Sequence, residues 1–365
     1  MTELLTKTQR PKTGWPEWIG YAAAAWSLLY GALGLVWALG GPGFPFGVGD
    51  AELMAEPGLA FTVSLLGRST PEVAGPIIAG LGALGALAGV LMARGYGTGA
   101  ARWLLPAYAW IVAVGLTVAV QDYRTLIVVA YTPVMLIGKV FFGWPEGVGW
   151  GALYRVERLN LLMLLLMGVV WALTAVAYRR KVNGDCGSCG RSEAERPSTL
   201  QRWARPATWT AFAIPLVYSV TRWAWALGFS LGIDPAFYAE GRESGLWLAG
   251  ATLATLGGIG AVLTLGLIQR WGEVFPRWMI GLRGKRVPPM LAVVPATLVA
   301  ALVASAGAMY IRLVVGRGGV TAETWPLELP ETLWVVWGAA LFVAAMAYHQ
   351  RRRGLCKACG RGETK

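Results

Sequence analysis

Apolar residues fall into long runs along this chain, separated by short stretches rich in charge, glycine or proline. A run of roughly 20 apolar residues makes a helix long enough to cross the hydrocarbon core of a bilayer. The pattern predicts an all-α polytopic membrane protein. Its eight predicted transmembrane helices lie at 19–40, 73–93, 103–121, 159–178, 207–229, 246–268, 289–311 and 331–348.

A further apolar segment at 125–144 is long enough to cross but carries Pro133 and Lys139. If it crossed, the first half of the chain would have five spans and the second half four. We therefore predict a re-entrant or interfacial helix there, which is tolerated at membrane depth where protein or water covers its backbone.

The two halves of the chain resemble one another in order. The sequence Trp-Ala-Leu-Gly at 37–40 recurs at 225–228, and Arg102-Trp103 recurs as Arg277-Trp278. Tyr178 and a Cys-x-x-Cys-Gly turn at 186–190 recur 170 residues later. We interpret this as a duplicated four-helix unit, with residues 1–190 as the first repeat, 191–205 as a linker and 206–365 as the second. Parallel repeats of this kind are related by a pseudo-two-fold axis along the membrane normal.

Glycine rows in the second and sixth predicted spans indicate close helix packing. The rows are Gly82, Gly85 and Gly89 in one span and Gly257, Gly258 and Gly260 in the other.

The net charge of +12 at first suggests a nucleic-acid partner, but 56% of the residues are hydrophobic and the charge is unevenly placed. With eight spans and an inner N-terminus, the inner segments hold 23 Lys and Arg and the outer segments hold 8. The positive-inside rule then predicts a multi-pass cell-membrane protein with both termini in the cytoplasm and no nucleic-acid partner.

Four cysteines are the most specific chemical signal in the sequence: Cys186, Cys189, Cys356 and Cys359. Each Cys-x-x-Cys turn supplies two thiolates, and the following glycine permits the positive φ of a tight turn. Two turns complete a tetrahedral Cys₄ site, so we expect a structural Zn²⁺, with iron as the less favoured metal. Thiol–disulfide exchange is the alternative. If the cysteines have no function, the two Cys-x-x-Cys-Gly turns would be separate flexible tails.

A second set of candidates is polar and lies in or beside the predicted spans. Arg222 is intramembrane, which costs at least roughly 2.5–3.5 kcal/mol and marks it as a functional candidate, although it could instead extend to the headgroups. We expect its counter-charge among Asp122, Asp234 and Glu157. An outward-facing pocket for an anionic or amphipathic molecule would combine Arg222 with Asp122, Arg124, Glu157, Arg158 and Arg312. A solvated rim of helix-end charges is the competing interpretation.

The Trp-Ala-Leu-Gly sequences and the Tyr-Arg-Arg and Cys-x-x-Cys-Gly-Arg endings resemble multi-spanning membrane proteins of actinobacterial type. That resemblance implies no known activity and no functional residue. No paired carboxylates, catalytic triad or phosphate-binding loop stands out, so we lean against an enzyme. The leading expectation is small-molecule transport or binding between the two repeats. The alternatives are a membrane thiol oxidoreductase or redox sensor, and an assembly protein that docks a cytoplasmic partner.

Overall fold

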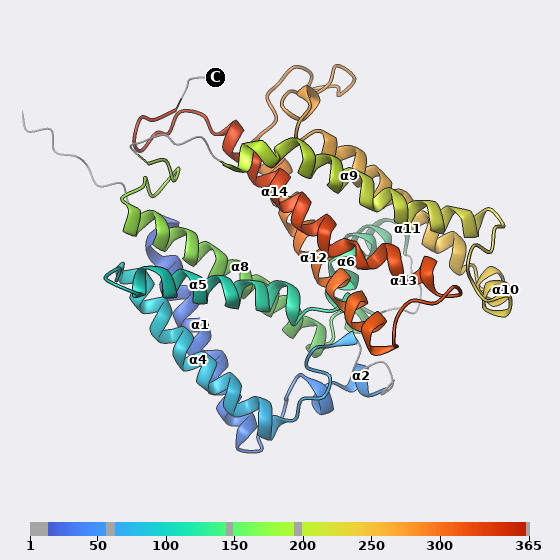
Figure 1. The fold of residues 1–365 in the computed structure, drawn as a ribbon, viewed down its shortest axis with the longest axis horizontal. Coiled ribbons are helices and arrows are strands. Elements are labelled where there is room, and N and C mark those ends of the chain that lie inside the picture. Colours follow the sequence, from blue (N-terminus) through green and yellow to red (C-terminus); the bar gives the residue numbers. More distant parts are fainter. Residues whose placement is uncertain (1–13, 56–62, 144–148, 193–198, 363–365) are drawn as a thin grey trace, which may run out of the picture.

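The computed structural model describes residues 14–55, 63–143, 149–192 and 199–362 (Figure 1). Eight helices in these ranges are long and apolar enough to cross a membrane, which confirms the predicted class. They are α1 (Trp15–Ala38), α4 (Pro71–Arg94), α5 (Ala101–Val114) continued by a π-helical turn (Gly115–Ala119), α6 (Tyr123–Phe142), α8 (Val156–Asn183), α11 (Leu246–Leu265), α12 (Pro289–Gly316), and the consecutive pair α13 (Trp325–Thr332) and α14 (Trp334–Arg352).

Helix α9 (Thr199–Ala226) covers the predicted span at 207–229 but is less apolar than these eight. It is 28 residues long and contains Pro206, Pro215 and Arg222. It packs along both α11 and α14, so it lies among helices that do meet the length and composition of a span. The described parts of the connections contain the short helices α2 (Ala51–Met54), α7 (Trp150–Leu153) and α10 (Pro235–Glu243).

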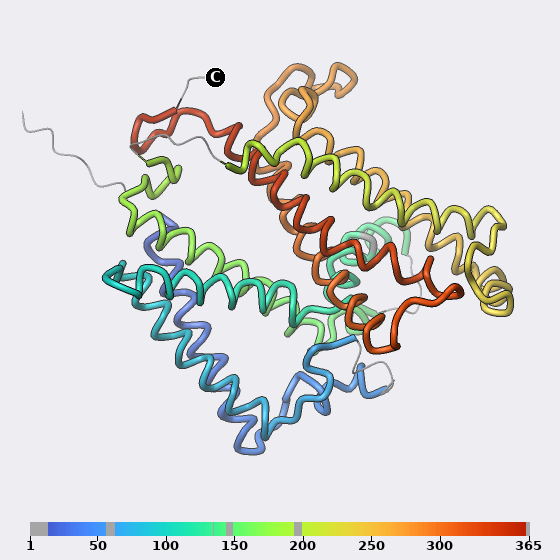
Figure 2. Tube along the Cα trace, in the orientation of Figure 1, coloured from blue at the N-terminus to red at the C-terminus, as the bar shows by residue number. Residues whose placement is uncertain are grey.

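The long helices form two bundles with the same order of neighbours. In the first bundle α1 packs on α4, α5 packs on α8, and α1 also packs on α8. In the second bundle α9 packs on α11, α12 packs on α14, and α9 also packs on α14. Figure 2 shows the two bundles side by side, with the green segment that follows α8 meeting the red segment that follows α14. The two Cys-x-x-Cys-Gly turns, or knuckles, lie in these segments. We call this the knuckle end of the molecule and the opposite end the far end.

Two glycines make the same contact in the two bundles. A Cβ on Gly168 of α8 would meet the Ala113 carbonyl of α5 and Thr117 of the π-helical turn that follows it. A Cβ on Gly338 of α14 would meet the Ala300 carbonyl and Ala304 of α12. Gly168 and Gly338 are 170 residues apart, the same spacing as the cysteine turns. A missing side chain therefore lets equivalent helices approach at equivalent points.

The connection that contains α6 begins and ends at the same end of the α5–α8 pair. Gln121, just before α6, donates from Nε2 to the Leu161 carbonyl near the start of α8 at 3.0 Å. Midway along α6, Thr132 is hydrogen-bonded to the Tyr154 hydroxyl, just before α8, at 2.9 Å. The chain thus leaves α5 and enters α8 at the same end, with α6 between them. This arrangement agrees with a re-entrant or interfacial segment, although α6 alone is long enough to cross.

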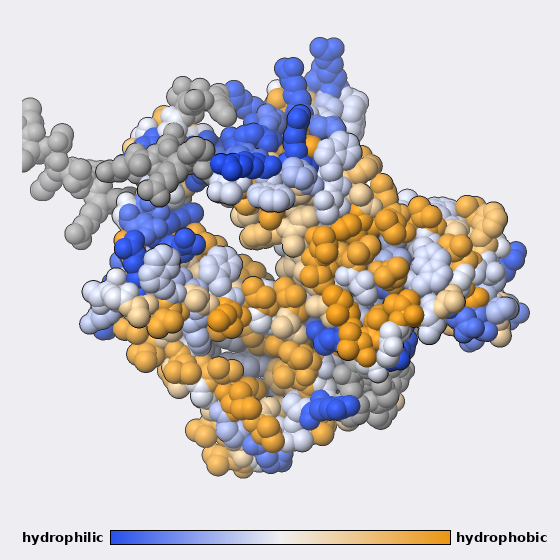
Figure 3. All heavy atoms as spheres, viewed as in Figure 1, coloured by the Kyte–Doolittle hydropathy of each residue, from blue (hydrophilic) through white to orange (hydrophobic). Residues whose placement is uncertain are grey.

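Large apolar side chains cover the outside of the bundles, as expected of helices whose solvent is lipid. Examples on α1 and α4 are Leu28, Leu29, Val73 and Leu87, all more than half exposed. Figure 3 shows hydrophobic side chains over the middle of the helices, and hydrophilic ones gathered at the knuckle end and on a loop that protrudes beside it.

One predicted repeat match is wrong in the structure. Arg102 and Trp103 lie in the first turn of α5, whereas Arg277 and Trp278 lie in the loop before α12, outside any helix. The glycine row of α11 is also misjudged. Gly257 and Gly260 have no neighbour within 4 Å of an added Cβ in the described part of the chain, and Gly258 has one at 3.9 Å.

Candidate metal centre and functional site

The two Cys-x-x-Cys-Gly turns, which we call the knuckles, share one backbone geometry. In the first, Cys186 N donates to Arg191 O at 3.0 Å and Gly190 N donates to Cys186 O at 2.7 Å. In the second, the bonds from Cys356 N and Gly360 N have the same pattern, at 2.9 and 2.8 Å. Gly190 and Gly360 have φ of +69° and +68°, the left-handed region that favours glycine. Each sequence therefore folds its own pair of thiols toward one point.

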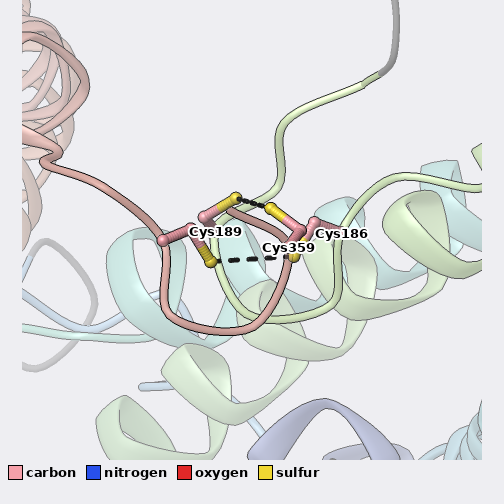
Figure 4. Close-up of side chains that lie close together, drawn as sticks. Cys186, Cys189 and Cys359 are labelled. Carbon is pink, nitrogen blue, oxygen red and sulfur yellow. Dashed lines mark hydrogen bonds between the residues drawn. The ribbon is translucent and has the colours of Figure 1, made fainter. Parts of the chain in front are cut away.

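The four sulfur atoms meet across the two halves of the chain (Figure 4). Cys186 Sγ lies 4.0 Å from Cys356 Sγ, and Cys189 Sγ lies 3.7 Å from Cys359 Sγ. All four sulfur atoms lie within 4.8 Å of one another. A tetrahedral zinc site with Zn–S bonds of about 2.3 Å has sulfur–sulfur edges of about 3.8 Å. The cluster therefore could hold a metal ion, and the two sulfur–sulfur distances across the halves are close to that edge length.

Arginines tie the two knuckles together. Arg191 donates from Nη1 to Arg361 O at 2.7 Å, and Arg361 donates from Nη1 to Arg191 O at 3.3 Å. Arg353, just after α14, donates to Cys189 O at 2.7 Å. The first two bonds are a reciprocal exchange between residues 170 positions apart. The knuckles are thus held face to face by their own side chains.

The pKa values of two neighbouring thiols, Cys186 and Cys189, are shifted in opposite directions. Burial opposes ionisation of Cys186, but hydrogen bonds from the Cys189 backbone and Cys359 outweigh it and lower the pKa of Cys186 to about 6. Burial and the neighbouring thiols instead raise the pKa of Cys189 to about 11. Thiolates crowded into one site repel one another, and a divalent cation removes that repulsion.

At the far end, Arg222 is 8% exposed and forms an ion pair with Glu331, which is 1% exposed. Its Nη1 also donates to Pro326 O at 2.7 Å. Pro330 has no N–H to complete the helical bond to that carbonyl, so the arginine takes its place. Glu331 Oε2 has no hydrogen-bond partner among the described residues.

The predicted partner of Arg222 was wrong. Asp122, Asp234 and Glu157 make no ion pair with it, and the partner is Glu331, 109 residues away. The Arg222 guanidinium also lies over the Tyr218 ring, 4.3 Å from its centroid. Arg222 is thus buried between helices. An acidic residue beside a proline at the start of the last span was the available sequence signal.

Three of the remaining predicted pocket residues, Asp122, Arg124 and Arg158, join one ion network with Asp50 and Glu52. Arg124, 2% exposed, is paired with Asp122 and Asp50, each at 2.7 Å. Glu52 lies 3.7 Å from the same guanidinium and accepts from Arg158 Nε at 3.0 Å. This is a buried ion network, so a fully solvated rim is wrong for Asp122 and Arg124. Glu157 forms no ion pair with any residue that the structure describes.

Arg312 links the two halves at the far end. From α12 it donates to the backbone carbonyls of Val63 at 3.0 Å, and of Ala119 and Gln121 at 3.4 Å each. The last two carbonyls close the π-helical turn after α5, and a cation is favourable at a helix C-terminus. π-Helical turns are frequent at functional sites.

A cavity of about 450 Å³ lies beside this contact, between the two halves. Its polar lining is Glu52 from α2, Tyr123 from α6 and Tyr310 from α12. Its apolar lining is Leu53, Ala55, Val63, Met309 and Leu313. Neither Arg222 nor Arg312 lines it, so the predicted set of six ligand residues does not form one pocket.

Comparison with family models, with curated proteins and with solved structures finds no match to this chain. Its function must therefore be argued from the site itself.

Proposed function

We propose that this chain is a membrane protein of two four-helix repeats whose cytoplasmic ends are joined by one structural Zn²⁺. The observation that carries the proposal is the meeting of four thiols, two from each half, with sulfur–sulfur distances of 3.7 and 4.0 Å across the halves. All four ligand positions are protein sulfur, which is typical of structural and not of catalytic zinc.

The duplication is supported by pairs of equivalent contacts. Tyr178 donates from its hydroxyl to Tyr96 O at 2.6 Å, and Tyr348 donates to Gly272 O at 2.7 Å. In each half the last long helix thus bonds the connection between the second and third long helices. With the shared order of neighbours, these contacts favour two copies related by a pseudo-two-fold axis along the membrane normal.

Zinc is preferred to a redox pair because all four sulfur atoms, two from each half, lie within 4.8 Å of one another, whereas thiol–disulfide exchange needs only one Cys-x-x-Cys pair. Elemental analysis of the purified chain should give about one Zn²⁺ per molecule. Iron at the same stoichiometry, with thiolate-to-iron absorption, would mean that the four cysteines share one site but bind iron instead of zinc. A metal-free protein with disulfides would favour the oxidoreductase alternative and overturn the proposal.

The cytoplasmic position of the knuckle end rests on the basic clusters at 179–181 and 351–353, which lie at the ends of α8 and α14. Single cysteines placed at Ser192 and Ser244 in a cysteine-free chain test it. Ser244 should react with an impermeant thiol reagent on intact cells, and Ser192 only after permeabilisation. Labelling of Ser192 from outside would reverse the orientation. The first thirteen residues, on which the predicted inner N-terminus depends, lie outside the described residues.

A second candidate function is small-molecule binding in the cavity between the halves. Among the described residues, the cavity is lined by one carboxylate, two phenol rings and apolar side chains, which suits an amphipathic molecule with a cationic group better than an anion. Benzyltrimethylammonium and benzylsulfonate are matched probes of opposite charge. The cation should bind, and Leu313→Trp should remove binding by filling the cavity. Leu216→Trp, in a separate groove between α9 and α11, should not. Binding of the anion alone would restore the anionic ligand expected from sequence.

A further inference from the structure

The chain between α11 and α12 forms an ordered, basic loop, which we call the finger (residues 273–287). Phe275 N donates to Lys285 O at 3.0 Å, and Gly284 N donates back to Phe275 O at 3.1 Å. Val287 N closes the base on Glu273 O at 3.0 Å. In the first half, the equivalent connection between α4 and α5 has only six residues, 95–100. The finger is therefore an addition to the second half.

The base of the finger is fixed to the knuckle end of α14. Arg352 donates from Nη2 to Val287 O at 2.9 Å and to Glu273 O at 3.2 Å. The Glu273 carboxylate lies 3.3 Å from the Arg351 guanidinium and 4.0 Å from that of Arg352. Glu273 is the only acidic residue of the finger, so its charge is already opposed at the base.

The tip carries both apolar and basic side chains into the open. Ile280 is 99% exposed and Trp278 is 77% exposed. Arg277, Arg283 and Lys285 are exposed on either side of them. Figure 3 shows this loop protruding from the bundle beside the knuckle end, with hydrophilic side chains at its outer edge. The tip thus presents two large apolar side chains and three basic ones together.

We propose that the finger binds the surface of a bilayer that contains anionic lipid. It joins two helices long enough to span, so its base lies at the membrane boundary. Tryptophan favours the interfacial region, and Lys and Arg there attract anionic headgroups. The charge of the tip and its exposed Trp278 and Ile280 fit that one surface together. The proposal does not depend on the metal or on the cavity.

Hydrogen exchange of the full chain in nanodiscs tests this. In discs of three parts phosphatidylcholine to one part phosphatidylglycerol, amides at 275–286 should exchange several-fold more slowly than in discs of phosphatidylcholine alone. The triple variant Arg277→Gln, Arg283→Gln, Lys285→Gln should lose the difference. In the double variant Trp278→Ser with Ile280→Ser, amides at 275–286 should be less protected from exchange than in the parent, in both kinds of disc. A matched control, Arg202→Gln with Arg205→Gln, removes two exposed basic residues of α9 at the same end and should leave the difference intact.

Equal exchange of 275–286 in the two kinds of disc would overturn the proposal. So would protection that appears only when a soluble protein is added, because the finger would then be a protein-docking loop.

Discussion

The α1–α4 pair of the first half and the α9–α11 pair of the second have corresponding places in the order of helix neighbours, but the two helices of each pair contact one another differently. In α1–α4, an added Cβ on Gly82 would lie 2.4 Å from the Gly31 Cα, so the two backbones touch. In α9–α11, Ser219 stands 188 positions after Gly31, the offset of the Trp-Ala-Leu-Gly sequences, and its hydroxyl donates to Ala254 O at 3.0 Å. An open apolar groove of about 490 Å³ runs along this second pair.

Three residues further on, the difference becomes one of charge. Gly34 in α1 lies against the backbone of α4, where a Cβ would be 2.9 Å from Ala79 N. At the same offset of 188, α9 has Arg222, paired with Glu331. The two halves thus have the same order of helix neighbours, but the first half uses backbone contact at this position and the second half uses a buried ion pair. The cysteine knuckles, by contrast, have the same geometry in both halves.

The largest expected effect concerns this shared feature. Cys186→Ser and Cys356→Ser come from different halves, but each should reduce bound metal from about one per chain to below about a tenth, because three thiolates hold zinc far less tightly than four. Metal analysis checks this, with Ser188→Ala as a control inside the first knuckle. Full metal in either cysteine variant would mean that the knuckles do not share a site.

The ion pair of the second half should give the next largest effect. Arg222→Ala or Glu331→Ala leaves a buried charge without its partner and should cost about 3–5 kcal/mol of stability. The double variant Arg222→Leu with Glu331→Leu should recover most of the loss. Thermal unfolding measures both, with the exposed Arg242→Ala as control. Equal stability of Arg222→Ala and the parent would show that the pair is not stabilising.

The glycine contact of the first half should matter less than the ion pair. Gly82→Val forces α1 and α4 apart and should cost about 1–3 kcal/mol. Gly260→Val, in the corresponding helix α11, has no neighbour within 4 Å in the described structure and should be nearly neutral. The two melting temperatures give the comparison directly. Similar losses would mean that the α11 glycines are packed after all.

The smallest effect is expected at Ser219. Ser219→Ala removes the hydroxyl that bonds Ala254 O and should cost about 1 kcal/mol. Thr252→Ala is the matched control, because Thr252 donates only to Leu248 O of its own helix, at 2.9 Å, and is exposed. Chemical unfolding in one detergent compares the two variants. A larger loss for Thr252→Ala would remove Ser219 as the contact that joins α9 to α11.

The cysteine site could be predicted because its signal is local and repeated: two turns of fixed spacing, each followed by glycine. Seven of the eight predicted spans coincide with helices long and apolar enough to cross, because hydropathy is summed over many residues. The predicted span at 207–229 does not, and α6 does. The partner of Arg222 could not be predicted, since Glu331 is 109 residues away and no periodic pattern links them. The α11 glycines misled because a glycine row says that close approach is permitted, not which face of the helix a neighbour covers. The match of Arg277-Trp278 to Arg102-Trp103 was wrong because it rested on residue identity alone, and the two pairs have different backbone structure.

The central claim, that one metal joins both halves, is tested most directly by hydrogen exchange of the first knuckle when only the second is changed. Cys356→Ser leaves residues 184–191 untouched in sequence. If the site is shared, the amides of Cys186 and Gly190, which close the first knuckle, should exchange many-fold faster in this variant, as they should in the parent after chelation. Faster exchange confined to 354–362, with the first knuckle unchanged, would contradict the account.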